Sequence, residues 1–121
     1  MAIRVLFRRR GPRIPAAPAD LAHLRNWCDT RVGIEAYLEP ETLVSVPGLC
    51  LVAFDGEWTR RPVGDVATAR KLTGQLKIPL YDALETGYPD RMRLYEEVRI
   101  ARERKERARR LREQIRDADG R

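Results

Sequence analysis

The fold is decided by a stretch that reads LCLVAFDGEW, residues 49–58. Its first six residues are all apolar, which is typical of a strand buried on both faces. Asp55 and Gly56 follow, and this pair predicts a two-residue hairpin loop because both central positions of a type I′ turn need positive φ. Such a loop would place Trp58 opposite Ala53. The stretch therefore predicts two antiparallel strands in a defined register.

Further strand signals flank this hairpin. Residues 34–39 alternate apolar and polar side chains, as a strand with one solvent-facing side does. A short strand is expected over 43–46, and Pro47 and Gly48 form a turn after it. Together with the hairpin, these segments predict four consecutive antiparallel strands between about residues 33 and 62.

Helices are predicted on both sides of these strands. Asp20 can cap a helix over 20–29 by accepting from the free amides of its first turn. Asp65 can cap a second helix, whose apolar stripe consists of Val66, Ala69, Leu72 and Leu76. Residues 78–82 then predict a short strand, which its proline confines to an edge or a strand start.

The last predicted element is a long helix from Asp90 to about Asp117, because this stretch lacks glycine and proline and consists mostly of strong helix formers. The predicted fold class is therefore α+β: a small antiparallel four-stranded meander with packed helices and a long projecting C-terminal helix. The chain divides into a basic mobile arm over 1–18, a single α+β domain over 19–98 and a basic helical extension over 99–121. Alternating apolar residues leave a short edge strand over 3–7 as an alternative within the arm.

Composition limits the chemistry of the chain. Its 121 residues suffice for one domain, and no uncharged stretch is long enough to span a membrane or to serve as a signal peptide, so we expect a cytosolic protein. A single histidine, His23, and two cysteines, Cys28 and Cys50, are too few for a zinc site. We therefore expect no metal and no cofactor, and the sequence identifies no small-molecule substrate.

Charge is spread unevenly along the chain. Residues 1–14 hold five arginines and no acid, residues 15–90 hold more acids than bases, and residues 91–121 hold 12 basic against 7 acidic side chains. Basic ends commonly bind phosphate without sequence preference. The residues expected to bind nucleic acid are Arg8, Arg9, Arg10, Arg13, Arg102, Arg104, Lys105, Arg107, Arg109 and Arg110. The leading hypothesis is a non-catalytic accessory protein that docks on nucleic acid or on a ribonucleoprotein or polymerase assembly.

Two other functions stay open. The first is a protein–protein adaptor or assembly subunit, for which the expected contact residues are Trp58, Arg60, Ala108, Leu111 and Ile115. The second, less favoured, is a small enzyme that uses a carboxylate cluster of Asp55, Glu57 and Asp82. The local alternative for these acids is a structural role in the turn and its flank.

Four short motifs carry a resemblance. They are DGEW at 55–58, RRPV at 60–63, IPLYD at 78–82 and GYPDRM at 87–92. With these motifs the chain resembles small uncharacterised basic proteins of high-GC actinobacteria over roughly residues 33–95. The resemblance implies a cytosolic bacterial protein, and it implies no activity, cofactor or catalytic residue.

Overall fold

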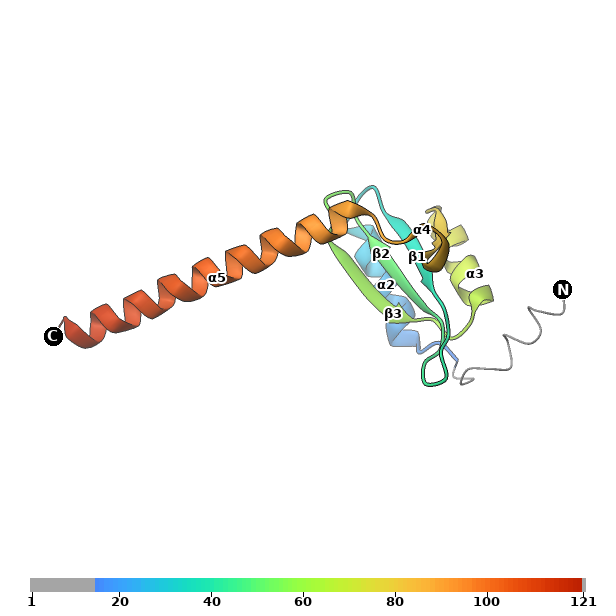
Figure 1. The fold of residues 1–121 in the computed structure, drawn as a ribbon. Helices are drawn as coiled ribbons and strands as arrows, with labels where there is room; N and C mark the ends of the chain where they lie inside the picture. Colours follow the sequence, from blue (N-terminus) through green and yellow to red (C-terminus); the bar gives the residue numbers. More distant parts are fainter. Residues whose placement is uncertain (1–14, 121) are drawn as a thin grey trace.

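The structure is a computed structural model that describes residues 15–120. Its elements in chain order are α2 (Pro18–Asp29), β1 (Glu35–Glu39), β2 (Gly48–Val52), β3 (Trp58–Pro62), α3 (Val66–Leu76), β4 (Leu80–Asp82), α4 (Ala83–Thr86) and α5 (Asp90–Asp119). The expected edge strand over 3–7 lies outside the described residues, as does most of the expected arm. The α+β class, the packed helices and the long C-terminal helix are confirmed (Figure 1).

The sheet is mixed, with strand order β3-β2-β1-β4. β1 pairs antiparallel with β2, and β2 with β3, but β4 runs parallel to β1. The prediction of a purely antiparallel four-stranded meander was therefore wrong: the fourth strand of the sheet is β4, from the segment predicted as a separate edge strand, and its pairing is parallel. The helix α3 returns the chain from the end of β3 to the end of the sheet where β1 starts, so β4 enters in the same direction as β1.

The strand expected over 43–46 is a loop instead. Leu43 and Val44 are 84% and 90% exposed, so their apolar side chains have no sheet face to cover. The loop is closed by a hydrogen bond from the amide of Thr42 to the carbonyl of Ser45 at 2.9 Å. A local turn has therefore replaced the ladder that a strand would need.

The hairpin forms where the sequence predicts it, but with a different register. The amide of Gly56 donates to the carbonyl of Ala53 at 3.0 Å, and the amide of Ala53 donates to the carbonyl of Glu57 at 2.8 Å. Gly56 has a φ of +95°, so the loop has three residues and ends on a glycine bulge. As a result Trp58 pairs with Val52 rather than with Ala53. The side chain of Trp58 therefore lies on the opposite face of the sheet from the one predicted.

The helices α2 and α3 cover one face of the sheet and form the larger core. Its buried residues are Leu24, Trp27, Ile34, Ala36, Leu49, Leu51, Ala53, Val63, Ala69 and Leu72. The Asp65 cap is confirmed, because its carboxylate accepts from the amide of Thr68 at 2.7 Å. Asp20 does not cap α2, which begins at Pro18 after Ala17, and Asp20 lies in the first turn instead. Proline needs no partner for its nitrogen at a helix start, so the helix begins two residues earlier than expected.

The second face of the sheet is covered by the C-terminal part of the chain. Its small core consists of Tyr37, Cys50 and Val52, with Trp58, Ala83 and Met92 packed against it. Figure 1 shows α2 behind the sheet, while the start of α5 crosses in front of it and the rest projects away. Among residues 15–120, no helix combines the length and the apolar character that crossing a membrane requires.

Candidate functional site

The base of α5 is fixed to the sheet by charged side chains. Arg91 donates through Nη2 to Glu35 Oε1 at 2.6 Å and through Nε to the carbonyl of Ala53 at 2.9 Å. The indole nitrogen of Trp58 donates to Glu96 Oε1 at 3.0 Å. These contacts lie in the first two turns of the helix, so they set the direction in which the remainder of α5 projects.

The ion pair at this base is reflected in the pKa of its carboxylate. The hydrogen bond from Arg91 holds the pKa of Glu35 below its ordinary value, and the hydroxyl of Tyr37, which donates to Glu35 at 3.0 Å, lowers it further. Burial is the main cause that raises the pKa of Tyr37 to about 12, and the hydrogen bond to Glu35 adds to it. Both groups are therefore held in the protonation states that the anchor requires.

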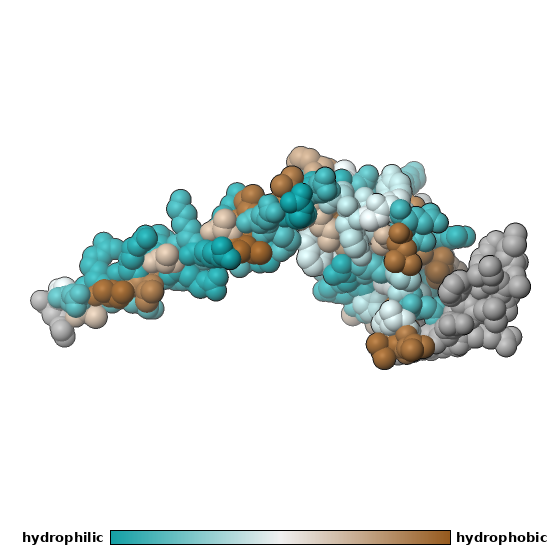
Figure 2. Space-filling view, in the orientation of Figure 1, coloured by the Kyte–Doolittle hydropathy of each residue, from teal (hydrophilic) through white to brown (hydrophobic). Residues whose placement is uncertain are grey.

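Beyond its base, α5 is a solvated helix. From Glu97 to Gly120 every residue is exposed except Glu106 and Ala108, which are partly buried. Asp90 lies in the first turn and Arg116 in the last, which is the arrangement that the helix dipole favours. Figure 2 shows hydrophilic side chains over most of the projecting helix, with apolar ones recurring among them.

Four arginines of α5 pair with acids of the same helix, and two of them bind two acids each. Arg99 binds Glu96 and Glu103, and Arg109 binds Glu106 and Glu113. Within the part of the chain that the structure describes, six cations of α5 form no ion pair; they are Arg102, Arg104, Lys105, Arg107, Arg112 and Arg116. These side chains keep their charge available for a partner.

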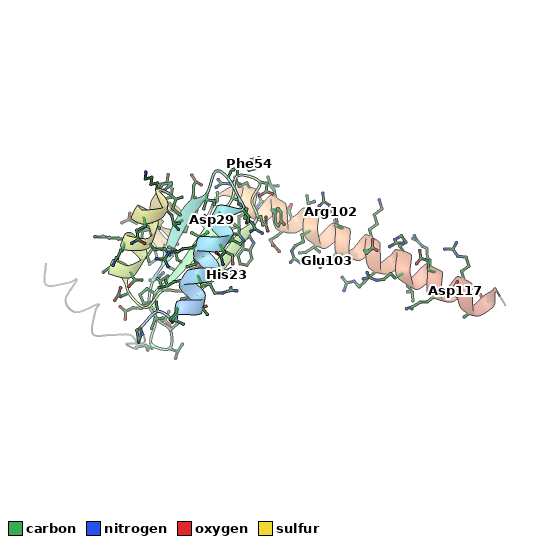
Figure 3. The ribbon with its side chains drawn as sticks, turned by 180° about the vertical axis from the view of Figure 1, so that it is seen from behind. His23, Asp29, Phe54, Arg102, Glu103 and Asp117 are labelled. Carbon is green, nitrogen blue, oxygen red and sulfur yellow. The ribbon has the colours of Figure 1, made fainter. Side chains whose placement is uncertain are left out.

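Five cations of α5 share one side of the helix, which we call the basic face. It consists of Arg102, Lys105, Arg109, Arg112 and Arg116, which follow one another at steps of three or four residues. At 1.5 Å per residue the row spans about 21 Å. Figure 3 shows Arg102 and Glu103 on different sides of the helix, but Glu106 and Glu113 border the row and bind Arg109. Of the predicted phosphate-binding cations of α5, Arg104, Arg107 and Arg110 lie off this face.

The predicted partner residues of α5 belong to a separate side of the helix, which we call the apolar stripe. It consists of Leu94, Ala101, Ala108, Leu111 and Ile115. Leu111 and Ile115 are 56% and 55% exposed, and Leu94 is 52% exposed. The stripe therefore has no cover within the described residues.

The other two predicted partner residues are used within the domain. The indole of Trp58 is half-buried between β3 and the base of α5, and the guanidinium of Arg60 lies 5.0 Å from its ring centroid. Arg60 also binds Glu39 at 2.7 Å. Trp58 lines a shallow cleft of about 350 Å³ beside α5, and its main contact is the anchor to Glu96.

The structure does not bring the three predicted carboxylates together. Asp55 accepts from the amide of Glu57 within the hairpin turn, and Glu57 binds Arg31 at 2.7 Å. Asp82 pairs with Leu38, at the opposite end of the sheet from the hairpin turn, and caps α4 there. The proposed cluster is therefore a set of local structural contacts. Among residues 15–120, no group of three or more histidine, cysteine or acidic side chains is placed to hold a metal ion.

A group of three tyrosines was missed from the sequence. The ring centroid of Tyr37 lies 5.5 Å from that of Tyr81 and 5.7 Å from that of Tyr88, and the three line a cleft of about 150 Å³. The hydroxyl of Tyr88 donates to Glu39. The group depends on the parallel pairing of β4 with β1, for which the sequence carries no local signal.

Comparison with known proteins gives no further information, because no family model, no curated protein and no solved structure matches the chain.

Proposed function

We propose that this protein is a non-catalytic accessory protein of the cytosol that docks on nucleic acid, alone or within a nucleoprotein assembly. The basic face of α5 makes the contact, and arginines 8, 9, 10 and 13 of the N-terminal segment add to it. The observation that carries the proposal is the row of cations on one side of an exposed helix: Arg102, Lys105, Arg112 and Arg116 form no ion pair within the described residues, and only Arg109 in that row is bound by acids.

The geometry of the basic face suits a row of phosphates. Cations three or four residues apart lie about 4.5–6 Å apart along a helix axis. A row of about 21 Å can therefore reach several phosphates of a backbone that carries one charge per roughly 3.4 Å of each strand. Arginine can also grip a phosphate with two parallel hydrogen bonds. Because the base of α5 is anchored to the sheet, the cations do not have to be ordered independently when the nucleic acid binds.

The test compares two double variants that remove the same charge from different sides of α5. Lys105→Gln with Arg112→Gln depletes the basic face, while Arg107→Gln with Arg110→Gln removes two cations from the other side. Affinity for a fluorescent duplex of about 20 base pairs is measured by anisotropy at about 50 mM salt, where each lost phosphate contact weakens binding roughly tenfold. Circular dichroism confirms that both variants keep their helix content.

We expect the basic-face variant to bind the duplex at least about tenfold more weakly than the control variant, because only its cations face the phosphates. Equal losses in the two variants would contradict the proposal, and so would a wild-type protein that fails to bind at this salt concentration.

A second candidate function is a protein–protein adaptor, and the exposed apolar stripe favours it. A 30-residue helix with no buried residue leaves Leu111 and Ile115 in water, where they stabilise nothing. Truncation after Arg99 tests this function, since it removes most of the stripe and leaves the anchored base in place. The truncated chain should keep its thermal unfolding midpoint and lose its protein partner in copurification; a partner retained after truncation would contradict an adaptor role for α5.

A further inference from the structure

The apolar stripe has the spacing of a helix-pairing surface. Leu94, Ala101, Ala108 and Ile115 follow one another every seven residues, and Leu111 occupies the intermediate position between the last two. Met92 and Glu96, through which α5 contacts the sheet, lie on the other side of the helix. The stripe therefore points away from the domain along the whole length of α5, where a second helix can reach it.

The flanks of the stripe are basic. Lys105 and Arg112 border it on one side and Arg107 borders it on the other, while no acid occupies a flanking position between residues 98 and 114. Arg104 lies within the seam itself, at the intermediate position between Ala101 and Ala108. None of these four cations forms an ion pair within the described residues, so each keeps its charge for a partner.

This arrangement argues against a second copy of the chain as the occupant. In a parallel pair, Arg104 would face Arg104 of the second copy, and Arg107 would face Arg112. In an antiparallel pair the flanking cations of the two copies would again meet each other. Two alanines in each seam would also leave the shared core poorly filled, because small residues would oppose small ones.

We infer that the apolar stripe of α5 binds an amphipathic α-helix of another protein whose seam carries large apolar residues and whose flanks are acidic. Leucine or isoleucine side chains of that helix fill the space over Ala101 and Ala108. Glutamates on its flanks pair with Lys105, Arg107 and Arg112, and one carboxylate lies opposite Arg104. This inference goes beyond nucleic-acid docking, since its apolar contacts use residues outside the basic face, although Lys105 and Arg112 border both surfaces.

The test uses a synthetic helical peptide as the probe. The acidic peptide has leucine at its seam positions, glutamate at its flanks and one glutamate placed to face Arg104; its own glutamates keep it from pairing with itself near pH 7. The comparison peptide carries lysine at every one of those acidic positions. Binding of each peptide to the full chain is measured by calorimetry.

Three variants of the full chain make the test specific. Leu111→Gln with Ile115→Gln removes the apolar contact, and Arg104→Glu reverses the charge in the seam. Arg99→Gln with Arg110→Gln is the control, because these two arginines lie on the side of α5 away from the stripe.

We expect the acidic peptide to bind and the lysine peptide to bind at least a hundredfold more weakly. The Leu111 and Ile115 variant should lose at least tenfold in affinity, the Arg104 variant should lose affinity for the acidic peptide, and the control variant should match the wild type.

Three results would overturn the inference. The first is acidic-peptide binding that is insensitive to the Leu111 and Ile115 variant, which would show simple charge attraction. The second is a wild-type dimer in sedimentation equilibrium that this variant dissociates, which would make a second copy the occupant. The third is a loss of duplex affinity in the Leu111 and Ile115 variant that equals its loss of peptide affinity, which would assign the stripe to the nucleic-acid interface. These outcomes rest on the Leu111 and Ile115 variant, whereas the basic-face comparison rests on the Lys105 and Arg112 variant, so the two proposals fail separately.

Discussion

Replacement of Gly56 by alanine should uncouple α5 from the sheet. Gly56 has a φ of +95°, and a Cβ there would lie 2.0 Å from the carbonyl oxygen of Arg91 and 2.8 Å from the Cβ of Tyr95. A carbon and an oxygen need more than about 3 Å, so the hairpin turn or the first turn of α5 must move by roughly 1 Å or more. Either shift loosens the hydrogen bond from Arg91 to Ala53.

The size of the effect follows from two contributions. A side chain in the left-handed region costs about 1–2 kcal/mol, and the displaced anchor adds to this cost. We therefore expect Gly56→Ala to lower the free energy of unfolding by at least about 2 kcal/mol in urea denaturation, which corresponds to a fall in Tm of roughly 10 °C. Hydrogen exchange should show lost protection in the first two turns of α5.

Gly74→Ala is the matched control. Gly74 lies within α3, and a Cβ there would have nothing within 4 Å. Alanine is the better helix former, so this variant should gain up to about 1 kcal/mol. The reasoning would be refuted if Gly56→Ala unfolded at the same urea concentration as the wild type, or if the two variants shifted the midpoint in the same direction.

Three further predictions concern the domain. The folded-state pKa of Glu35 lies below its ordinary value of 4.5, chiefly because of Arg91, so the stability that Glu35 contributes is present above the unfolded pKa and is lost as pH falls through the folded pKa. Below about pH 5 the urea midpoint of the wild type should therefore fall more steeply than that of Glu35→Gln. Parallel curves would contradict this. Burial raises the pKa of the Cys50 thiol to about 11, so in the folded protein near pH 8 it should react with a disulfide reagent far more slowly than in denaturant, and equal rates would contradict its burial. Asp65→Ala removes the cap on the amide of Thr68 and should cost about 1 kcal/mol in urea denaturation, whereas an unchanged midpoint would show that the cap contributes nothing.

Local signals were sufficient for most of the elements. The structure confirms the helix predicted from the Asp65 cap and from the apolar residues spaced along α3. It also confirms the helix predicted from the uninterrupted helix formers after Pro89. The proline of residues 78–82 correctly indicates an edge strand, and β4 lies at the edge of the sheet. These features depend on neighbours within about one helical turn, which a sequence shows directly.

The errors arose where a distant contact decides between two local solutions. An Asp-Gly pair fits both a two-residue loop and a three-residue loop that ends on a glycine bulge. In the structure the three-residue loop forms, and Gly56 packs closely against Arg91. The partner of β4 depends on the path of α3, which no short motif specifies. Similarly, helical spacing places the cations of α5 on one face, but the contact between Trp58 and Glu96, 38 residues apart, determines which side of α5 faces the sheet.

The central claim is that the basic face of α5 binds phosphate, and the salt dependence of duplex affinity tests it most directly. The four unpaired cations of this face, together with arginines 8, 9, 10 and 13, predict that the logarithm of the association constant falls with the logarithm of salt concentration with a slope of about −4 or steeper. Affinity should then drop by roughly a few hundredfold between about 50 and 200 mM salt. A slope near zero, or no binding at the lower salt concentration, would contradict the account.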